Sequence, residues 1–420
     1  MTRRLLLLAT ALTALLVLPA PVARAEAEPE GGGPITDVVQ VENGDTHACA
    51  RLTNGRAMCW GTGDANRLGF NGISDSSRAG FVEGVGDTGQ LTQVAQLSLG
   101  AAHSCARLTT GQARCWGENQ NRQLGTGDQQ DGGPFVVENR TGGPMTGITA
   151  IAAGANHTCA IVAGGQVRCF GSNVNGQLGD GSIQPRTRAV TVLDVNGSTP
   201  LTGATQITAG SNYTCVRLNT GQARCWGSNT SGQLGRGNND SRNRPVIVKN
   251  AAGTGPLTGV TQLSAGASTT CARMSDDSAR CWGHDFNGLL GDGGVDDNTV
   301  LPVRVLAVSG GGFLGGVKNI NVGSFHACAT VSGNQLRCWG DGNDSQLGTG
   351  DVSDRNRPAV VRNVADTGAL LGATQVSAGQ DFTCARLNNG QVRCFGEDSD
   401  GQLGSGGGGT SDTPVVVLTL

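Results

Sequence analysis

The stretch CVRLNTGQARCWGSNTSGQLG, residues 215–235, decides the fold prediction. Cys215 and Cys225 flank a short turn, Asn-Thr-Gly at residues 219–221, and a tryptophan and a glycine-rich loop follow them. A three-residue hairpin loop favours a left-handed residue at its last position, which glycine adopts without a steric penalty. In that hairpin Leu218 faces Gln222, and the antiparallel register then places Cys215 opposite Cys225. The two sulfur atoms are expected to lie within disulfide range.

Cysteine pairs of this kind recur along the chain and use all 14 of its cysteines. Asp277 and Asn334 replace the turn glycine in two units, and both residue types tolerate the left-handed conformation. A zinc site or a redox pair would bring the cysteines closer together in sequence, so both are weaker alternatives. We predict one cross-strand disulfide in each unit: Cys49–Cys59, Cys105–Cys115, Cys159–Cys169, Cys215–Cys225, Cys271–Cys281, Cys328–Cys338 and Cys384–Cys394.

The second cysteines recur every 54 to 57 residues, which marks seven internal repeats. Each unit carries four short strand-like runs separated by Gly, Asn, Asp and Pro, such as residues 205–210, 213–218, 222–227 and 244–249. These repeats predict an all-β fold, a seven-bladed β-propeller with four antiparallel strands per blade. Residues 413–420 should form the last outer strand, and the pattern leaves open whether it completes its own blade or the first one.

An aromatic residue follows the second cysteine in every unit and points to the opposite face of the sheet. We expect these rings to pack between blades, because large aromatic side chains dominate core burial. A ring of ligand-stacking platforms is the alternative. The residues are Trp60, Trp116, Phe170, Trp226, Trp282, Trp339 and Phe395.

The N-terminus predicts export. Residues 1–25 combine two arginines, an apolar run and a small-residue cleavage site, which is typical of a secretory signal peptide. The pair Arg3 and Arg4 leaves twin-arginine export as an alternative. Residues 26–36 are expected to be a short linker and residues 37–420 the propeller, a secreted protein, extracellular or periplasmic, without membrane insertion. Export also supplies the oxidising compartment in which disulfides persist.

The charge pattern argues against a nucleic-acid partner. Lys and Arg number 30 against 33 Asp and Glu, for a net charge of −3, and both signs are scattered along the chain. A nucleic-acid-binding protein would instead show a clustered basic face.

Three segments carry a common pattern of Ala-Gly, His, the cysteine pair, an aromatic residue and Gly-Gln-Leu-Gly: residues 99–125, 153–179 and 378–404. The pattern resembles the repeats of the regulator of chromosome condensation family, in a secreted, bacterial-type form. The resemblance covers nearly the whole mature chain and implies a seven-bladed propeller. The family's founding activity is nucleotide exchange on a nuclear GTPase together with chromatin binding. Because this chain has an export signal, a cysteine pair in each unit and no basic tail, that activity is not transferred. A secreted bacterial propeller that inhibits β-lactamases looks similar, which gives weight to an inhibitor or receptor-like role.

Two groups of residues invite a metal hypothesis. His47, His103, His157 and His326 occupy one repeat position, which holds Tyr213, Thr269 and Phe382 in the other units. That variation favours a structural slot over a metal site on the ring axis. The acidic loops at residues 341–351 and 397–404 superficially resemble calcium loops but lack regular ligand offsets and a terminal bidentate Glu. We therefore predict no metal and no cofactor, and leave calcium as an open alternative.

The sequence contains no recognisable catalytic motif, so no catalytic residue is predicted and the protein is not expected to be an enzyme. In a four-strand meander, alternate connections reach opposite faces of the ring. The Ala-Gly-x-x-His and Gly-Gln-Leu-Gly loops should share one face, and the Asn-Thr-Gly turns and the variable connectors between units the other. Binding usually evolves on loops carried by a rigid scaffold.

The leading hypothesis is a secreted, monomeric, non-enzymatic protein that binds another extracellular protein and can act as its inhibitor. The alternatives are a lectin-like ring for carbohydrate or cell envelope, and a propeller enzyme. Exposed aromatic residues on one face would favour the lectin, and clustered carboxylates in the central channel the enzyme. The sequence does not identify ligand-binding residues.

Overall fold

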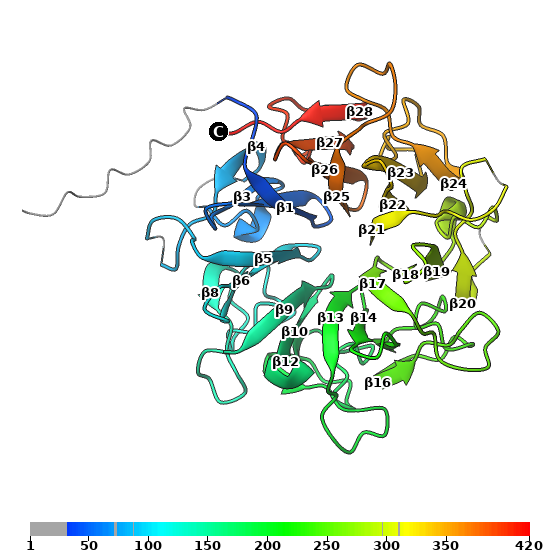
Figure 1. Ribbon diagram of the computed structural model, residues 1–420. Helices are drawn as coiled ribbons and strands as arrows, with labels where there is room; N and C mark the ends of the chain where they lie inside the picture. Colours follow the sequence, from blue (N-terminus) through cyan, green and yellow to red (C-terminus); the bar gives the residue numbers. More distant parts are fainter. Residues whose placement is uncertain (1–31, 71–73, 87, 296, 310) are drawn as a thin grey trace, which may run out of the picture.

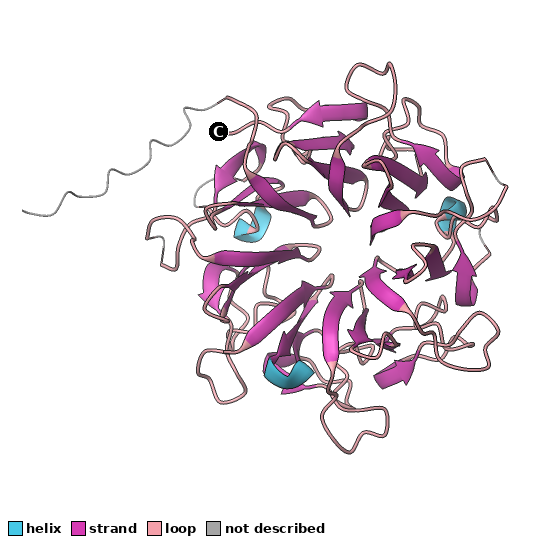
Figure 2. Ribbon diagram, in the orientation of Figure 1, coloured by secondary structure: helices cyan, strands magenta, loops and turns pink. Residues whose placement is uncertain are grey.

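The computed structural model describes residues 32–70, 74–86, 88–295, 297–309 and 311–420. The predicted signal peptide and residues 26–31 of the predicted linker lie outside the described residues. Seven four-stranded sheets surround a central axis, as Figure 1 shows, and the strands dominate the secondary structure in Figure 2. The predicted all-β, seven-bladed propeller is confirmed.

The strands follow one another in chain order within each blade. Blades 1 to 4 contain β1 (Val38–Asn43), β2 (His47–Leu52), β3 (Ala57–Gly61) and β4 (Ser76–Phe81); β5 (Val94–Leu99), β6 (His103–Leu108), β7 (Ala113–Gly117) and β8 (Gly132–Val136); β9 (Ile148–Ala153), β10 (His157–Val162), β11 (Gln166–Gly171) and β12 (Arg186–Thr191); and β13 (Ala204–Ala209), β14 (Tyr213–Leu218), β15 (Ala223–Gly227) and β16 (Arg242–Ile247).

Blades 5 to 7 contain β17 (Val260–Ala265), β18 (Thr269–Met274), β19 (Ala279–Gly283) and β20 (Thr299–Arg304); β21 (Val317–Val322), β22 (His326–Val331), β23 (Gln335–Gly340) and β24 (Arg355–Val360); and β25 (Ala373–Ala378), β26 (Phe382–Leu387), β27 (Val392–Gly396) and β28 (Ser411–Val416). Three short 3₁₀ helices complete the described elements: η1 (Asp64–Asn66), η2 (Ala163–Gly165) and η3 (Phe286–Gly288).

The hairpin around the Asn-Thr-Gly turn of residues 219–221 forms as predicted. Cys215 pairs with Cys225 in the β14–β15 register, and the Leu218 N–H donates to the Gln222 carbonyl at 2.8 Å. Gly221 takes φ +73°, and Asp277 and Asn334 take the same left-handed conformation at their turns. Each of the seven predicted disulfides is present, with Cα atoms 4.1 Å apart. That distance is typical of a non-hydrogen-bonded antiparallel pair.

The hydrophobic core lies between blades. One cluster joins Cys49 and Cys59 of blade 1 to Leu97 and Trp116 of blade 2, and the other blade boundaries repeat the arrangement. The Trp116 Nε1–H donates to the Arg67 carbonyl of the preceding blade at 2.9 Å, and the equivalent tryptophans do the same. All seven predicted aromatic residues are fully buried, so the interblade packing prediction is confirmed and the stacking-platform alternative is wrong.

The ring closes through both ends of the chain. β28 pairs with β27, so the last strand completes its own blade. The residues after it then lie between the N-terminal segment and blade 1: the Ile35 N–H donates to the Val417 carbonyl at 2.9 Å, and the Ala79 N–H to the Leu418 carbonyl at 2.9 Å. Residues 32–35 of the predicted linker therefore take part in the closure, beside β4 in Figure 1.

Candidate functional site

The strand order creates two loop-bearing faces. The Thr62 N–H donates to the Thr46 carbonyl at 3.0 Å, which joins the Ala-Gly-x-x-His type of loop to the loop after β3. We call the face formed by these loops, residues 44–47 and 62–69 and their equivalents, the His-loop face. On the other face the Val94 N–H donates to the Gly55 carbonyl at 2.9 Å, which joins a hairpin turn to a connector. We call this second face the connector face.

A ring of glycines encircles the channel on the His-loop face. A Cβ atom built on Gly44 would lie 2.4 Å from the Gly100 carbonyl oxygen, and each glycine of the ring meets the next in this way until Gly379 meets Gly44. Any side chain here would separate neighbouring blades. The ring consists of Gly44, Gly100, Gly154, Gly210, Gly266, Gly323 and Gly379.

The four equivalent histidines are interblade contacts. The His157 side chain is fully buried, and its Nε2 lies 2.9 Å from the Thr214 hydroxyl of the next blade. The Thr214 hydroxyl in turn donates to the Gln177 carbonyl at 2.9 Å. Tyr213 fills the same slot in blade 4 and donates to the Thr269 carbonyl at 2.7 Å. The structure therefore supports a structural slot in place of a metal-binding ring.

Burial lowers the pKa of these histidines. The values for His103 and His157 fall to about 3 and that for His326 to about 4, while the pKa of His47 is lowered well below its usual range. Desolvation of the charged imidazolium is the largest cause in each case. The imidazoles are therefore neutral at neutral pH.

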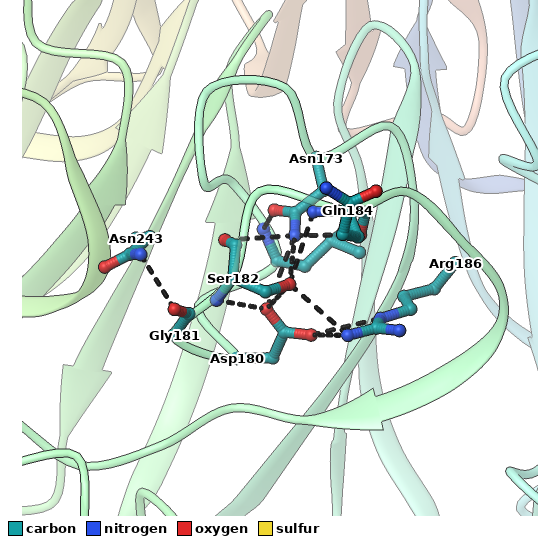
Figure 3. A network of polar contacts seen from close by, with 8 residues as sticks. Asn173, Asp180, Gly181, Ser182, Gln184, Arg186 and Asn243 are labelled. Atoms are coloured by element: carbon teal, nitrogen blue, oxygen red, sulfur yellow. Dashed lines mark hydrogen bonds and ion pairs between the residues drawn. The ribbon is translucent and has the colours of Figure 1, made fainter.

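The acidic glycine-rich loops use their carboxylates as internal turn supports. In the loop after β11, Asp180 accepts hydrogen bonds from Ser182 and from the Arg186 guanidinium at 2.9 Å (Figure 3). Asn173 extends the network to the carbonyls of Ser182 and Gln184 (Figure 3).

The two loops that resembled calcium loops follow the same principle. Asp398 accepts from the Leu403 N–H at 2.8 Å, and Asp351 pairs with Arg355 at 2.7 Å. Among the described residues, no group of three His, Cys, Asp or Glu side chains is arranged to hold a metal ion.

Blades 5 to 7 carry an aromatic and acidic area on the His-loop face. Phe286 is 38% exposed, stacks on His284 at a centroid distance of 6.1 Å and meets the Phe325 ring edge-on at 5.8 Å. The Asn287 amide donates to Asp341 at 3.2 Å, which joins the aromatic group to neighbouring carboxylates. We define the aromatic–acidic surface by His284, Phe286, Phe325, Asp344, Asp381 and Glu397, together with the buried Asp341 beneath them.

The carboxylates of this surface lie close enough to affect one another. The pKa of Asp381 rises to about 6, chiefly because it is partly buried and also because Asp344, Glu397 and Asp341 repel its negative charge. This surface was not predicted from the sequence, because Phe286 and Phe325 belong to different units. Their departure from the repeat, Phe286 where blade 3 has Val174 and Phe325 where blade 3 has Asn156, was the available signal.

The seven inner strands enclose a polar central channel with a cavity of about 320 Å³. Glutamine side chains join the inner strands of neighbouring blades: Gln96 Nε2 donates to the Ile151 carbonyl at 3.0 Å, and Gln96 Oε1 accepts from the Ile151 N–H at 3.2 Å. Gln40, Gln206, Gln262 and Gln375 make the same double contact.

Two carboxylates line this channel, Glu42 and Asp45, both from blade 1. Burial raises the pKa of Glu42 to about 7. Neither carboxylate was among the candidate residues predicted from the sequence. Aligning the inner strands places Glu42 where the other units have only Ser, Ala, Thr or Asn.

Within the part of the chain that the structure describes, no helix is long and apolar enough to cross a membrane.

Fold, repeat and loop geometry together define a disulfide-linked, seven-bladed repeat propeller with one polar channel and two loop-bearing faces. The chain belongs to the regulator of chromosome condensation (RCC1) repeat family. The family's repeat model matches residues 38–67, 94–123, 148–177, 204–233, 260–289, 317–346 and 373–402, one match in each blade. A second model of the same repeat matches residues 111–161, 221–273 and 335–386.

Curated relatives include the ultraviolet-B receptor UVR8 of Arabidopsis thaliana, 28% identical over 79% of this chain and 71% of the relative. The human E3 ubiquitin-protein ligase HERC2 is 25% identical over 77% of this chain, which spans only 6% of that protein. A similar solved structure is that of human WBSCR16, with a TM-score of 0.68 and 19% identity, covering 86% of this chain and 91% of that one. Another is yeast RCC1 (Prp20) bound by Kap60, with a TM-score of 0.66 and 16% identity, covering 95% of this chain and 91% of that one. These two structures support the fold.

Proposed function

We propose that this protein is a secreted, non-enzymatic ring that binds another extracellular protein through the aromatic–acidic surface, and that inhibition of that partner is one outcome of binding. The observation that carries the proposal is the exposure of Phe286 within an aromatic group beside several carboxylates. Aromatic residues are enriched in protein interfaces and often supply most of the binding energy. The acidic neighbours favour a partner surface that carries Lys or Arg.

Secretion is proposed from two features together. Residues 1–25 have the pattern of a signal peptide, and seven disulfides are typical of proteins in oxidising compartments. The repeat family includes a propeller solved in complex with another protein, Kap60, which supports protein binding as a use of this fold. A fold by itself does not identify a partner.

Affinity capture with residues 26–420 tests the proposal. The bait is mixed with extracellular proteins and envelope polysaccharide from the source organism, with and without calcium. We expect one protein to be captured stoichiometrically and independently of calcium. Recovery of glycan alone would favour the lectin alternative, and capture only with calcium would favour a metal-dependent site.

Variants then locate the interface. Phe286→Ser should weaken capture at least tenfold, because truncating a residue at a binding hot spot costs about 2 kcal/mol or more. Val174→Ser alters the equivalent loop position of blade 3, and Phe313→Ser removes a 50% exposed ring from a connector. Neither control should change capture. If Phe313→Ser abolishes binding and Phe286→Ser does not, the connector face is the interface and the proposal fails.

A further inference from the structure

Glu42 departs from the role of its counterparts in the channel. Each inner strand places one residue two positions before the glycine ring, and five of these residues accept a hydrogen bond from a backbone N–H of the next blade. They are Ser98, Thr208, Ser264, Asn321 and Ser377. Glu42 occupies this position in blade 1 but accepts from two side-chain amides: Gln40 Nε2 at 3.0 Å and Gln375 Nε2 at 3.3 Å. Unlike its counterparts, its carboxylate accepts no backbone N–H of the next blade, and its contact across a blade boundary is with the side-chain amide of Gln375 in blade 7.

Both amides bind the same oxygen of Glu42, Oε1. No described residue donates a hydrogen bond to Oε2, which leaves this oxygen to the channel. Next to it in sequence, Asn43 is only 9% exposed and lines the channel, and its Oδ1 atom has no hydrogen-bond partner among the described residues. A buried amide oxygen without a partner is energetically costly, so a ligand that donates to it would be stabilised.

Asp45 adds a second negative charge to the lining of the same channel. It lies in the loop between β1 and β2 and lines the channel, and its carboxylate accepts no hydrogen bond from the described residues. The equivalent positions in the other units are uncharged: Ala101, Ala155, Ser211, Ala267, Ser324 and Gln380. Glu42 and Asp45 are the only titratable side chains among the described residues that line the cavity. One blade therefore supplies all of the charge in the channel.

We propose that Glu42, Asn43 and Asp45 form a binding site for a primary ammonium group in the central channel. An ammonium group carries one positive charge and three N–H donors, which match two carboxylates and a free amide oxygen. A quaternary ammonium has no N–H donor and is usually bound by an aromatic cage. No aromatic residue is among the described side chains lining the cavity. The site therefore selects for the N–H donors of the ammonium group as well as for its charge.

The ammonium group has two possible sources with the same chemistry, a free diamine or a lysine side chain of a bound protein. The cavity of about 320 Å³ opens among the loops of the His-loop face, so either source has access. The site does not depend on the proposed protein interface, because its residues belong to blade 1 and the aromatic–acidic surface to blades 5 to 7. The two proposals can therefore fail separately.

Binding should depend on pH. Burial raises the pKa of Glu42 to about 7, so a cation that needs the carboxylate must displace a proton at lower pH. Burial also raises the pKa of Asp45, and the nearby Arg67 charge partly opposes that rise. The other charged or titratable groups on elements packed against β1 are His47 and Arg51 on β2 and Arg386 on β26. Affinity should rise between pH 6 and pH 8, with release of a proton from Glu42.

Isothermal titration calorimetry with 1,5-diaminopentane at pH 8 tests the site. We expect saturable one-to-one binding by residues 26–420. The neutral analogue 1,5-pentanediol and the quaternary ion tetramethylammonium should not bind. Glu42→Gln keeps the shape of the side chain, Glu42→Ser installs the residue of blades 2, 5 and 7, and Asp45→Ala installs that of blades 2, 3 and 5. Each should weaken binding at least tenfold, whereas Ser211→Ala, the position equivalent to Asp45 in blade 4, should not.

Circular dichroism and thermal melting establish that each variant is folded. A titration with Nα-acetyl-lysine methylamide distinguishes the sources: affinity equal to that of the diamine supports a lysine side chain, and much weaker affinity supports a free diamine. The proposal is overturned if the unmodified protein does not bind 1,5-diaminopentane at millimolar concentration. It is also overturned if Glu42→Gln and Glu42→Ser bind the diamine as well as the unmodified protein does.

Discussion

Replacing His157 with tyrosine should make the protein less sensitive to acid. His157 is fully buried between blades 3 and 4, and burial lowers its pKa to about 3. An unfolded histidine has a pKa near 6.5, so the unfolded chain binds a proton that the folded chain excludes. The contribution of His157 to stability is therefore fully present above pH 6.5 and is lost as the pH falls towards 3.

The size of this effect follows from the two pKa values. Between pH 7 and pH 4.5, a histidine whose pKa falls from 6.5 to 3 on folding loses about 2.5 kcal/mol of stability by proton linkage. Tyrosine stays neutral over this range, and Tyr213 shows how the slot of blade 4 holds it, with its hydroxyl bonded to the Thr269 carbonyl. Relative to the unmodified protein, His157→Tyr should therefore gain about 2.5 kcal/mol on acidification.

The difference between the two proteins is the informative quantity. Burial raises the pKa of Glu42 to about 7 and that of Asp398 to about 6, and groups with raised folded pKa values gain stability as the pH falls through those values. These carboxylates oppose the histidines in the total pH profile, but they are common to both proteins and cancel in the comparison.

Guanidinium chloride unfolding at pH 7 and pH 4.5, with the disulfides intact and tryptophan fluorescence as the signal, measures the difference. Thr269→Tyr is the matched control, because Thr269 occupies the same slot in blade 5 and carries no titratable proton. Its stability relative to the unmodified protein should be the same at both pH values. Proton linkage requires a change of about 2.5 kcal/mol in the stability of His157→Tyr relative to the unmodified protein between the two pH values. A change of less than about 0.5 kcal/mol would show that His157 does not exclude a proton in the folded state.

Three further predictions concern the ring itself. The double substitution Cys215→Ala, Cys225→Ala should lower the free energy of unfolding by up to about 2.8 kcal/mol, the chain-entropy value for a loop of this length. Non-reducing peptide mapping of the unmodified protein should find disulfides only within units. Gly235→Ala should cost on the order of 3 kcal/mol in chemical denaturation, because its φ is +62° and a Cβ would lie 2.7 Å from the Trp282 ring nitrogen. Gly86→Ala, with φ +69° and no atom within 4 Å, should cost only about 1–2 kcal/mol; equal losses would show that the contact with Trp282 is unimportant. Deletion of residues 418–420 should lower the melting temperature, because it removes backbone hydrogen bonds to Gly33 and Ala79. Leu420→Ser keeps the backbone and should have little effect. A larger drop in melting temperature for Leu420→Ser than for the deletion would mean that the Leu420 side chain closes the ring.

Local chemistry determined most of the fold at the level of the sequence. The spacing of each cysteine pair and a turn residue that tolerates positive φ specify a hairpin with one register, which predicts the disulfide without any long-range contact. The regular period specifies seven copies of that hairpin. The aromatic residue after each second cysteine and the variable slot before each first cysteine could likewise be assigned to packing, because their equivalents in other units limit what they can do.

Tertiary structure alone decided the features that depend on contacts between distant units. The last strand completes its own blade, while residues 417–420 pair with both the N-terminal segment and blade 1, and no count of strands distinguishes these pairings. Phe286 and Phe325 meet only because blades 5 and 6 are neighbours on one face. Glu42 and Asp45 could have been noticed as exceptions in the repeat, but their shared position in a polar channel and the raised pKa of Glu42 arise from the closed ring. Ring closure removes these carboxylates from bulk water, and sequence spacing does not report desolvation of this kind.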